Sequence, residues 1–145
     1  MSTTHPPVEY KGRILGVVFL IAAQILVGFI HVIFGFWLLT SPRGAPEVGV
    51  FVSLAPSNIY SIYTIIFGVL ALLFAFLLWS QKSWGWIGTF AVLVFVIVAD
   101  SLTLLDLPSI PGIPKFAGYG EITYSVLVIL YLLQKHVRTK YGIII

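Results

Sequence analysis

The chain has no cysteine among its 145 residues and carries few charges. The lack of cysteine excludes disulfide bonds, thiolate catalysis and iron–sulfur ligation by this chain. Charged residues make up 9% of the sequence, against roughly 25% in an ordinary soluble domain. With 59% hydrophobic residues and a mean hydropathy of +1.07, the composition excludes a water-soluble fold.

Apolar residues gather in four long runs, at about residues 14–40, 59–79, 84–105 and 116–133. The hydrocarbon core of a bilayer is roughly 30 Å thick, so about 20 apolar helical residues are needed to cross it. Each run comes close to that length. We therefore predict an all-α, four-transmembrane-helix bundle, with residues 1–145 as a single integral membrane domain. The remaining residues are too few for a folded domain outside the membrane, which needs at least about 40.

The basic residues predict the orientation of this bundle, because cytoplasmic loops carry an excess of Lys and Arg. With both termini in the cytoplasm, six basic residues lie inside (Lys11, Arg13, Lys82, Lys135, Arg138 and Lys140) and two lie outside (Arg43 and Lys115). We expect a multi-pass protein of the plasma membrane with both termini cytoplasmic. The net charge of +3 comes from residues that flank the runs, so no nucleic-acid partner is predicted.

The connections between the runs fit this orientation. Residues 80–83 form a tight inner turn, whereas the outer connections, residues 41–58 and 106–117, contain three prolines each. Prolines at this density exclude continuous helix. Trp37, Trp79, Trp84 and Trp86 lie near the ends of the runs, where an interfacial aromatic belt is expected.

Glycines predict where the helices pack against one another. Apolar side chains gain little by leaving lipid for each other, so membrane helices associate at small residues and through hydrogen bonds. We interpret Gly28 and Gly35 in the first run, Gly68 in the second and Gly88 in the third as helix-packing positions. The alternative reading of these small residues is a ligand groove.

Three ionisable residues, His31, Asp100 and Glu121, lie inside the predicted spans, and Gln24 shares one helix stripe with His31. A charge at the centre of a span costs about 2.5–3.5 kcal/mol, which makes such residues functional candidates. At 1.5 Å per residue, His31 lies roughly 14 Å and Asp100 roughly 9 Å below the outer helix ends, and Glu121 lies about one turn into its helix. If the helices bring them together, the four residues form a candidate intramembrane polar site in which His31 and Asp100 hold or pass protons.

Structural roles are the alternative for the same residues. His31 then bonds to a hydroxyl or carbonyl of a neighbouring helix, and Asp100 bonds to Ser101, Thr103 or the polar loop above it. Glu121 then stabilises the positive end of its own helix dipole.

A metal centre is the third reading, since one histidine and two carboxylates match the ligands of non-haem iron or zinc. The residues are spread over three helices, however, and form no motif. A bis-histidine haem is excluded for a single chain because His5 and His136 lie outside the spans. We predict no cofactor, no bound metal and no catalytic residue.

The last residues combine basic and apolar character. Lys135, Arg138 and Lys140 follow the fourth run directly, where each basic side chain near an anionic lipid surface contributes about 1 kcal/mol. They are predicted to contact lipid headgroups, or else only to fix the topology. The apolar residues 141–145 are expected to fold back on the bilayer or to dock on another subunit.

Three stretches carry a family resemblance: residues 63–68, the tryptophan-rich turn at 79–86, and residues 131–142. Together they resemble a loose group of small four-span prokaryotic membrane proteins, many of them archaeal. The likeness covers the second to fourth runs. It implies the four-helix fold and no particular activity or site residue.

These observations favour a non-catalytic accessory or stabilising subunit that packs against other membrane proteins or against copies of itself in the bilayer. The alternative is a small transporter or proton-conducting element that uses His31 and Asp100, with Glu121 and Gln24, and needs a homo-oligomer. An enzyme ranks third, because it requires a metal at His31, Asp100 and Glu121.

Overall fold

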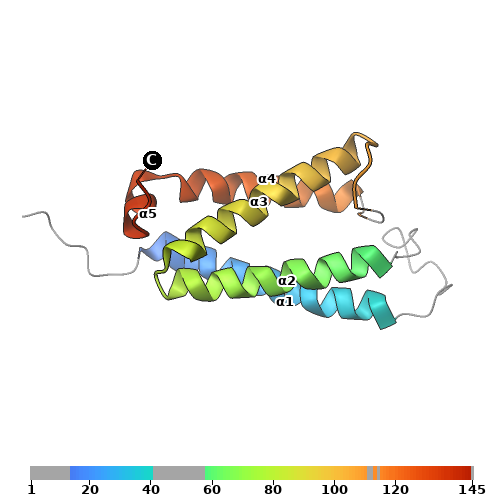
Figure 1. Cartoon of the computed structure of the whole chain (residues 1–145), viewed down its shortest axis with the longest axis horizontal. Helices are drawn as coiled ribbons and strands as arrows, with labels where there is room; N and C mark the ends of the chain where they lie inside the picture. The colour runs from blue at the N-terminus through green and yellow to red at the C-terminus, as the bar shows by residue number, and fades with distance from the viewer. Residues whose placement is uncertain (1–13, 41–57, 111–112, 114, 145) are drawn as a thin grey trace, which may run out of the picture.

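The computed structural model describes residues 14–40, 58–110, 113 and 115–144. This part of the chain forms five helices and no strand: α1 (Leu15–Thr40), α2 (Asn58–Trp79), α3 (Ser83–Leu104), α4 (Lys115–Leu132) and α5 (Lys135–Lys140), as Figure 1 shows. The predicted all-α class is confirmed. The first four helices begin and end within one residue of the predicted runs.

Three of these helices are long and apolar enough to cross a membrane: α1, residues Ile59–Trp79 of α2, and α3. This is what an integral membrane protein requires. Helix α4 has 18 residues, but Lys115 and Glu121 lie in its first half and make it less apolar. A fourth crossing therefore stays a prediction, as does the cytoplasmic position of the termini.

Neighbouring helices run antiparallel, which gives the bundle two ends. At the loop end, α1 and α3 stop and α2 and α4 begin; at the turn end, α2 turns through residues 80–82 into α3, and α4 leads into α5. Helix α1 lies along α2, and α3 packs on both α2 and α4. Figure 1 shows α3 starting beside α2 at the turn end and leaning away from it toward the loop end.

Glycines set the close approach of α1 and α2. A Cβ atom at Gly68 would lie 2.7 Å from the Gly28 carbonyl oxygen and 2.8 Å from the backbone nitrogen of Val32. A Cβ atom at Gly35 would lie 3.0 Å from the backbone nitrogen of Ile65. The two backbones therefore touch along the glycine positions predicted from the sequence, as helix packing at small residues requires.

The turn end is closed by buried aromatic residues. Gly88 of α3 faces the ring of Phe74 on α2. Trp86 is 5% exposed, and its indole Nε1–H donates a hydrogen bond of 3.0 Å to the Leu132 carbonyl at the end of α4. Trp86 therefore faces the protein interior and not lipid, whereas Trp84 is 69% exposed; the interfacial depth predicted for both stays a prediction.

The short helix α5 covers the core at the turn end. Val137 and Tyr141 are buried there together with Leu78, Leu93 and Leu132. The Tyr141 hydroxyl donates a hydrogen bond of 3.0 Å to the carbonyl oxygen of Leu78 near the end of α2. Burial raises the pKa of the Tyr141 phenol to about 12, so the hydroxyl keeps its proton at neutral pH. Val137 and Tyr141 thus dock α5 on its own bundle, whereas Ile144 is 97% exposed.

The loop end has a smaller core. Leu38, Tyr60, Ala99 and Ile113 are buried together there. The predicted outer connection at residues 41–58 lies almost entirely outside the described residues. Of the second predicted connection, residues 106–117, the described part begins with a turn and joins α4 already at Lys115.

Candidate functional site

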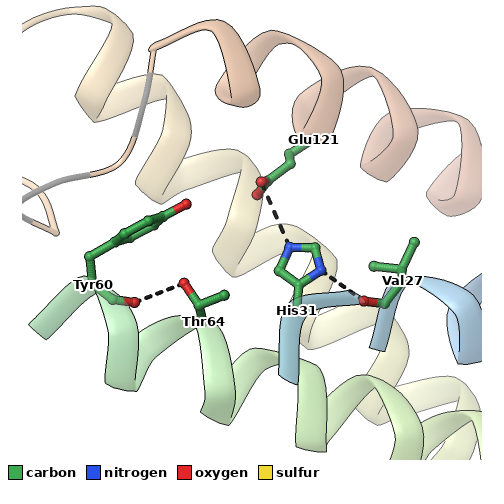
Figure 2. Close-up of polar contacts among 5 residues, drawn as sticks. All are labelled: Val27, His31, Tyr60, Thr64 and Glu121. Atoms are coloured by element: carbon green, nitrogen blue, oxygen red, sulfur yellow. Dashed lines mark hydrogen bonds and ion pairs between the residues drawn. The ribbon is translucent and has the colours of Figure 1, made fainter. Parts of the chain in front are cut away.

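His31 joins helices α1 and α4 in the half of the bundle nearer the loop end. Its Nδ1 atom lies 2.8 Å from the Val27 carbonyl oxygen of its own helix, and its Nε2 atom lies 3.8 Å from Oε1 of Glu121 (Figure 2). Because a carbonyl oxygen only accepts hydrogen bonds, Nδ1 must carry the hydrogen. Nε2 therefore faces the carboxyl group either as a lone pair or as a second N–H, and the two groups form an ion pair when the imidazole is protonated.

Glu121 belongs to this contact and not to the start of its helix. It lies six residues after Lys115, where α4 begins. The field of a helix terminus acts mainly within the first turn, so the dipole role considered from the sequence does not fit this position. Its side chain is 28% exposed and points to His31, as Figure 2 shows.

Asp100 is fully buried on the face of α3 that packs against α4. A Cβ atom at Gly118 would lie 3.5 Å from the Asp100 Cβ, which is ordinary van der Waals contact, so Asp100 lies opposite Gly118 of α4. Neither oxygen of Asp100 has a hydrogen-bond donor among the described residues. Bonds from Asp100 to Ser101 or Thr103, considered above, are not formed; the Thr103 hydroxyl bonds instead to the Ala99 carbonyl and to Ser109.

The Asp100 and Glu121 carboxyl groups are close enough to interact, and His31 acts electrostatically on both. Two ionised carboxylates are acceptors only, so a hydrogen bond between them requires that one of them carry a proton. His31 of α1, Asp100 of α3 and Glu121 of α4 thus form one cluster. We call it the carboxyl cluster.

Helix α2 supplies hydroxyl and aromatic groups around the carboxyl cluster. Phe67 stands edge-on to the His31 ring, with 4.7 Å between the ring centroids. Tyr60 and Tyr63 lie within electrostatic range of both carboxyl groups. The Tyr63 hydroxyl and the Ser61 hydroxyl are buried without a partner among the described residues, whereas the Thr64 hydroxyl donates to the Tyr60 carbonyl at 2.8 Å (Figure 2).

Gln24 is not part of the carboxyl cluster. It lies seven residues from His31 toward the turn end, roughly 10 Å along the helix. Its Nε2 atom donates a hydrogen bond of 3.1 Å to the hydroxyl of Thr89 on α3, and both side chains are buried. Gln24 therefore makes a second polar contact, deeper in the bundle.

The residues of the carboxyl cluster do not form a metal centre. No group of three His, Cys, Asp or Glu side chains that could hold a metal ion occurs within residues 14–40, 58–110, 113 and 115–144. The metal enzyme considered from the sequence therefore has no site in this region.

The basic residues predicted to contact lipid headgroups lie on or beside α5. Lys135 is exposed, whereas Arg138 and Lys140 are partly buried. Both of the latter take part in further interactions within the protein. Their role toward lipid stays a prediction.

Sequence reasoning missed Gly118 and three residues whose hydroxyls are buried without a partner among the described residues: Ser61, Tyr63 and Ser125. Ser61 and Tyr63 stand in the first turns of the second apolar run, where a hydroxyl count along the helix would have found them. Nothing in the sequence marks Gly118, because its position opposite Asp100 depends on how α3 and α4 pack.

Comparison with known proteins adds no relative. No protein-family model matches the chain, and the searches of curated proteins and of solved structures find no match either. The resemblance to small four-span prokaryotic proteins therefore stays a prediction.

Proposed function

We propose that this protein is an integral membrane protein that takes up and releases protons at the carboxyl cluster of His31, Asp100 and Glu121. It works as a small proton-conducting or proton-coupled transport element of the plasma membrane, with four crossings and both termini in the cytoplasm. This reverses the order favoured by the sequence, where the accessory role ranked first.

One observation carries the proposal: Asp100 is 0% exposed, yet neither of its oxygens receives a hydrogen bond from the described residues. A buried carboxylate held for structural reasons is paired and fully hydrogen-bonded, because burying it otherwise costs several kcal/mol. A proton on Asp100 or Glu121 removes one charge and supplies the missing donor. His31 is the third group of the cluster, and its ordinary pKa lies closest to neutral pH.

The test is proton flux through purified protein in liposomes that contain a pH-sensitive dye. His31→Ala and Asp100→Asn are expected to abolish the flux seen with the wild type. His136→Ala and Asp106→Asn are matched controls, because they make the same changes outside the cluster. Equal flux in the cluster variants and the wild type would refute the proposed function.

A second candidate function is the accessory subunit, and the groove between α2 and α3 favours it. The groove has a volume of about 590 Å³ and is lined by Ile59, Ile62, Tyr63, Ile66, Phe67, Leu70, Ala91, Val92, Phe95 and Ile110. An apolar groove on a membrane helix pair suits a transmembrane helix of a partner.

Site-specific photo-crosslinking in native membranes tests this second function. A crosslinker at Ile66, inside the groove, is expected to capture one defined protein. The same group at Leu26, which is 61% exposed on α1, is the control. Capture of lipid alone from Ile66, or the same products from both positions, would contradict an accessory role through this groove.

A further inference from the structure

Ser125 extends the polar interior from the carboxyl cluster toward the turn end. It lies one helical turn beyond Glu121 on α4, roughly 6 Å along the axis, and it is 1% exposed. Its hydroxyl has no hydrogen-bond partner among the described residues. The hydroxyls of Thr64, Thr103 and Thr123, by contrast, all donate to the carbonyl four residues earlier in their own helices.

The contact between Gln24 and Thr89 lies beyond Ser125, nearer the turn end. Asp100 is opposite Gly118, and α3 and α4 are antiparallel, so Ser125 comes about level with Leu93 and roughly 6 Å short of Thr89. The Oε1 atom of Gln24 is buried and has no partner within the described part of the chain. Its Nε2–H already bonds to Thr89, which leaves the Thr89 hydroxyl hydrogen free to point elsewhere.

Measured along the helix axes, these positions follow one another at about the length that a single bridging water spans. One water that bonds to two groups spans about 5.5–6 Å, twice the usual O–H···O distance of about 2.8 Å. Buried polar groups that the protein leaves unbonded commonly bind such waters. Val96, Leu93 and Val128 are buried in the same part of the bundle, so the side chains around the two polar contacts are apolar.

We propose that Ser125 and Thr89, the latter oriented by Gln24, continue the carboxyl cluster inward as a proton path inside one chain. This inference rests on the proposed function, and it removes the need for a homo-oligomer to build the path. Each hydroxyl accepts a hydrogen bond from the water on the cluster side and donates its own hydrogen to the water beyond. The proton that leaves a hydroxyl is replaced by the one that arrives, so Ser125 and Thr89 end each passage unchanged.

The experiment measures proton flux in liposomes for Ser125→Ala, with Thr123→Ala as the matched control. Thr123 is on the same helix, but it is exposed and its hydroxyl is satisfied by Tyr119. Loss of one relay link is expected to lower the flux about tenfold, the factor that corresponds to one hydrogen bond. Thr123→Ala is expected to conduct like the wild type. Ser125→Thr restores a hydroxyl at the same place and is expected to recover most of the flux.

The outcomes separate this inference from the proposed function. If Asp100→Asn abolishes flux while Ser125→Ala and Thr89→Val conduct normally, the path is refuted and the proton site survives. If Ser125→Thr is as slow as Ser125→Ala, packing and not the hydroxyl explains the loss, and the path is again refuted. Absence of flux in the wild type would defeat the proposed function itself.

Discussion

Replacing Gly68 with alanine is expected to destabilise the protein, because α1 and α2 are in backbone contact at this residue. The new Cβ atom would lie 2.7 Å from the Gly28 carbonyl oxygen and 2.8 Å from the Val32 nitrogen. Ordinary van der Waals contact begins at 3.4 Å, so α1 would have to retreat by the difference, about 0.7 Å. Both obstacles are backbone atoms, which cannot rotate out of the way as the end of a side chain can.

The cost follows from this displacement. Forcing an extra carbon into a well-packed contact typically costs about 1–3 kcal/mol, and a gap of about 0.5–1 Å forfeits a quarter to a half of the contact energy around it. Alanine returns up to about 1 kcal/mol through its better helix propensity. We therefore expect Gly68→Ala to lower the free energy of unfolding by about 1–2 kcal/mol.

Gly120 provides the control on α4. It is exposed, and a Cβ atom placed there would meet nothing within 4 Å. Gly120→Ala is therefore expected to be neutral or to stabilise by up to about 1 kcal/mol. Unfolding in mixed micelles with a rising fraction of sodium dodecyl sulfate, followed by far-ultraviolet circular dichroism, compares the two variants. If both unfold at the same fraction, the backbone contact between α1 and α2 is refuted.

Three further predictions use other parts of the fold. Trp86→Phe loses the hydrogen bond to the Leu132 carbonyl and is expected to lower the free energy of unfolding by about 1 kcal/mol in the same assay. Trp84→Phe changes an exposed side chain and should cost nothing measurable. Equal losses in the two variants would argue against the buried indole. Asp100→Asn removes a buried carboxylate and supplies a donor, so the protein is expected to keep or gain thermal stability; a clear loss would identify Asp100 as a structural anchor. The chain has no cysteine, so single introduced cysteines can report the topology. In intact cells, Leu107→Cys is expected to react with a membrane-impermeant maleimide, whereas Ser80→Cys is expected to react only after permeabilisation. The opposite pattern would invert the proposed topology.

The helices could be predicted from the sequence because their signal is local. A run of about 20 apolar residues is helical in lipid whatever its neighbours are, which is why each predicted end differs from the structure by at most one residue. The individual site residues His31, Asp100 and Glu121 were found for a similar reason, since an ionisable residue in an apolar run is visible without a fold.

Their grouping could not be predicted, because it depends on how far each helix is rotated about its axis. Nothing in the sequence says that Asp100 lies opposite Gly118, or that His31 turns to α4 while Gln24, on the same stripe, turns to α3. The burial of Trp86 was missed for a related reason. A tryptophan beside a turn resembles an interfacial residue until a carbonyl from a distant helix is seen to accept its N–H.

The glycine contacts make α1 and α2 one stiff hairpin, whereas α1 and α4 meet only sparsely. The boundary between this hairpin and the pair of α3 and α4 passes through the carboxyl cluster, with His31 on one side of it and Glu121 on the other. A rocking movement of one half against the other, pivoting at residues 80–82, would stretch the 3.8 Å contact of His31 with Glu121 while the contacts of Gly28, Gly35 and Gly68 stay closed. Such a movement would couple the charge carried by this pair to the distance between the two halves.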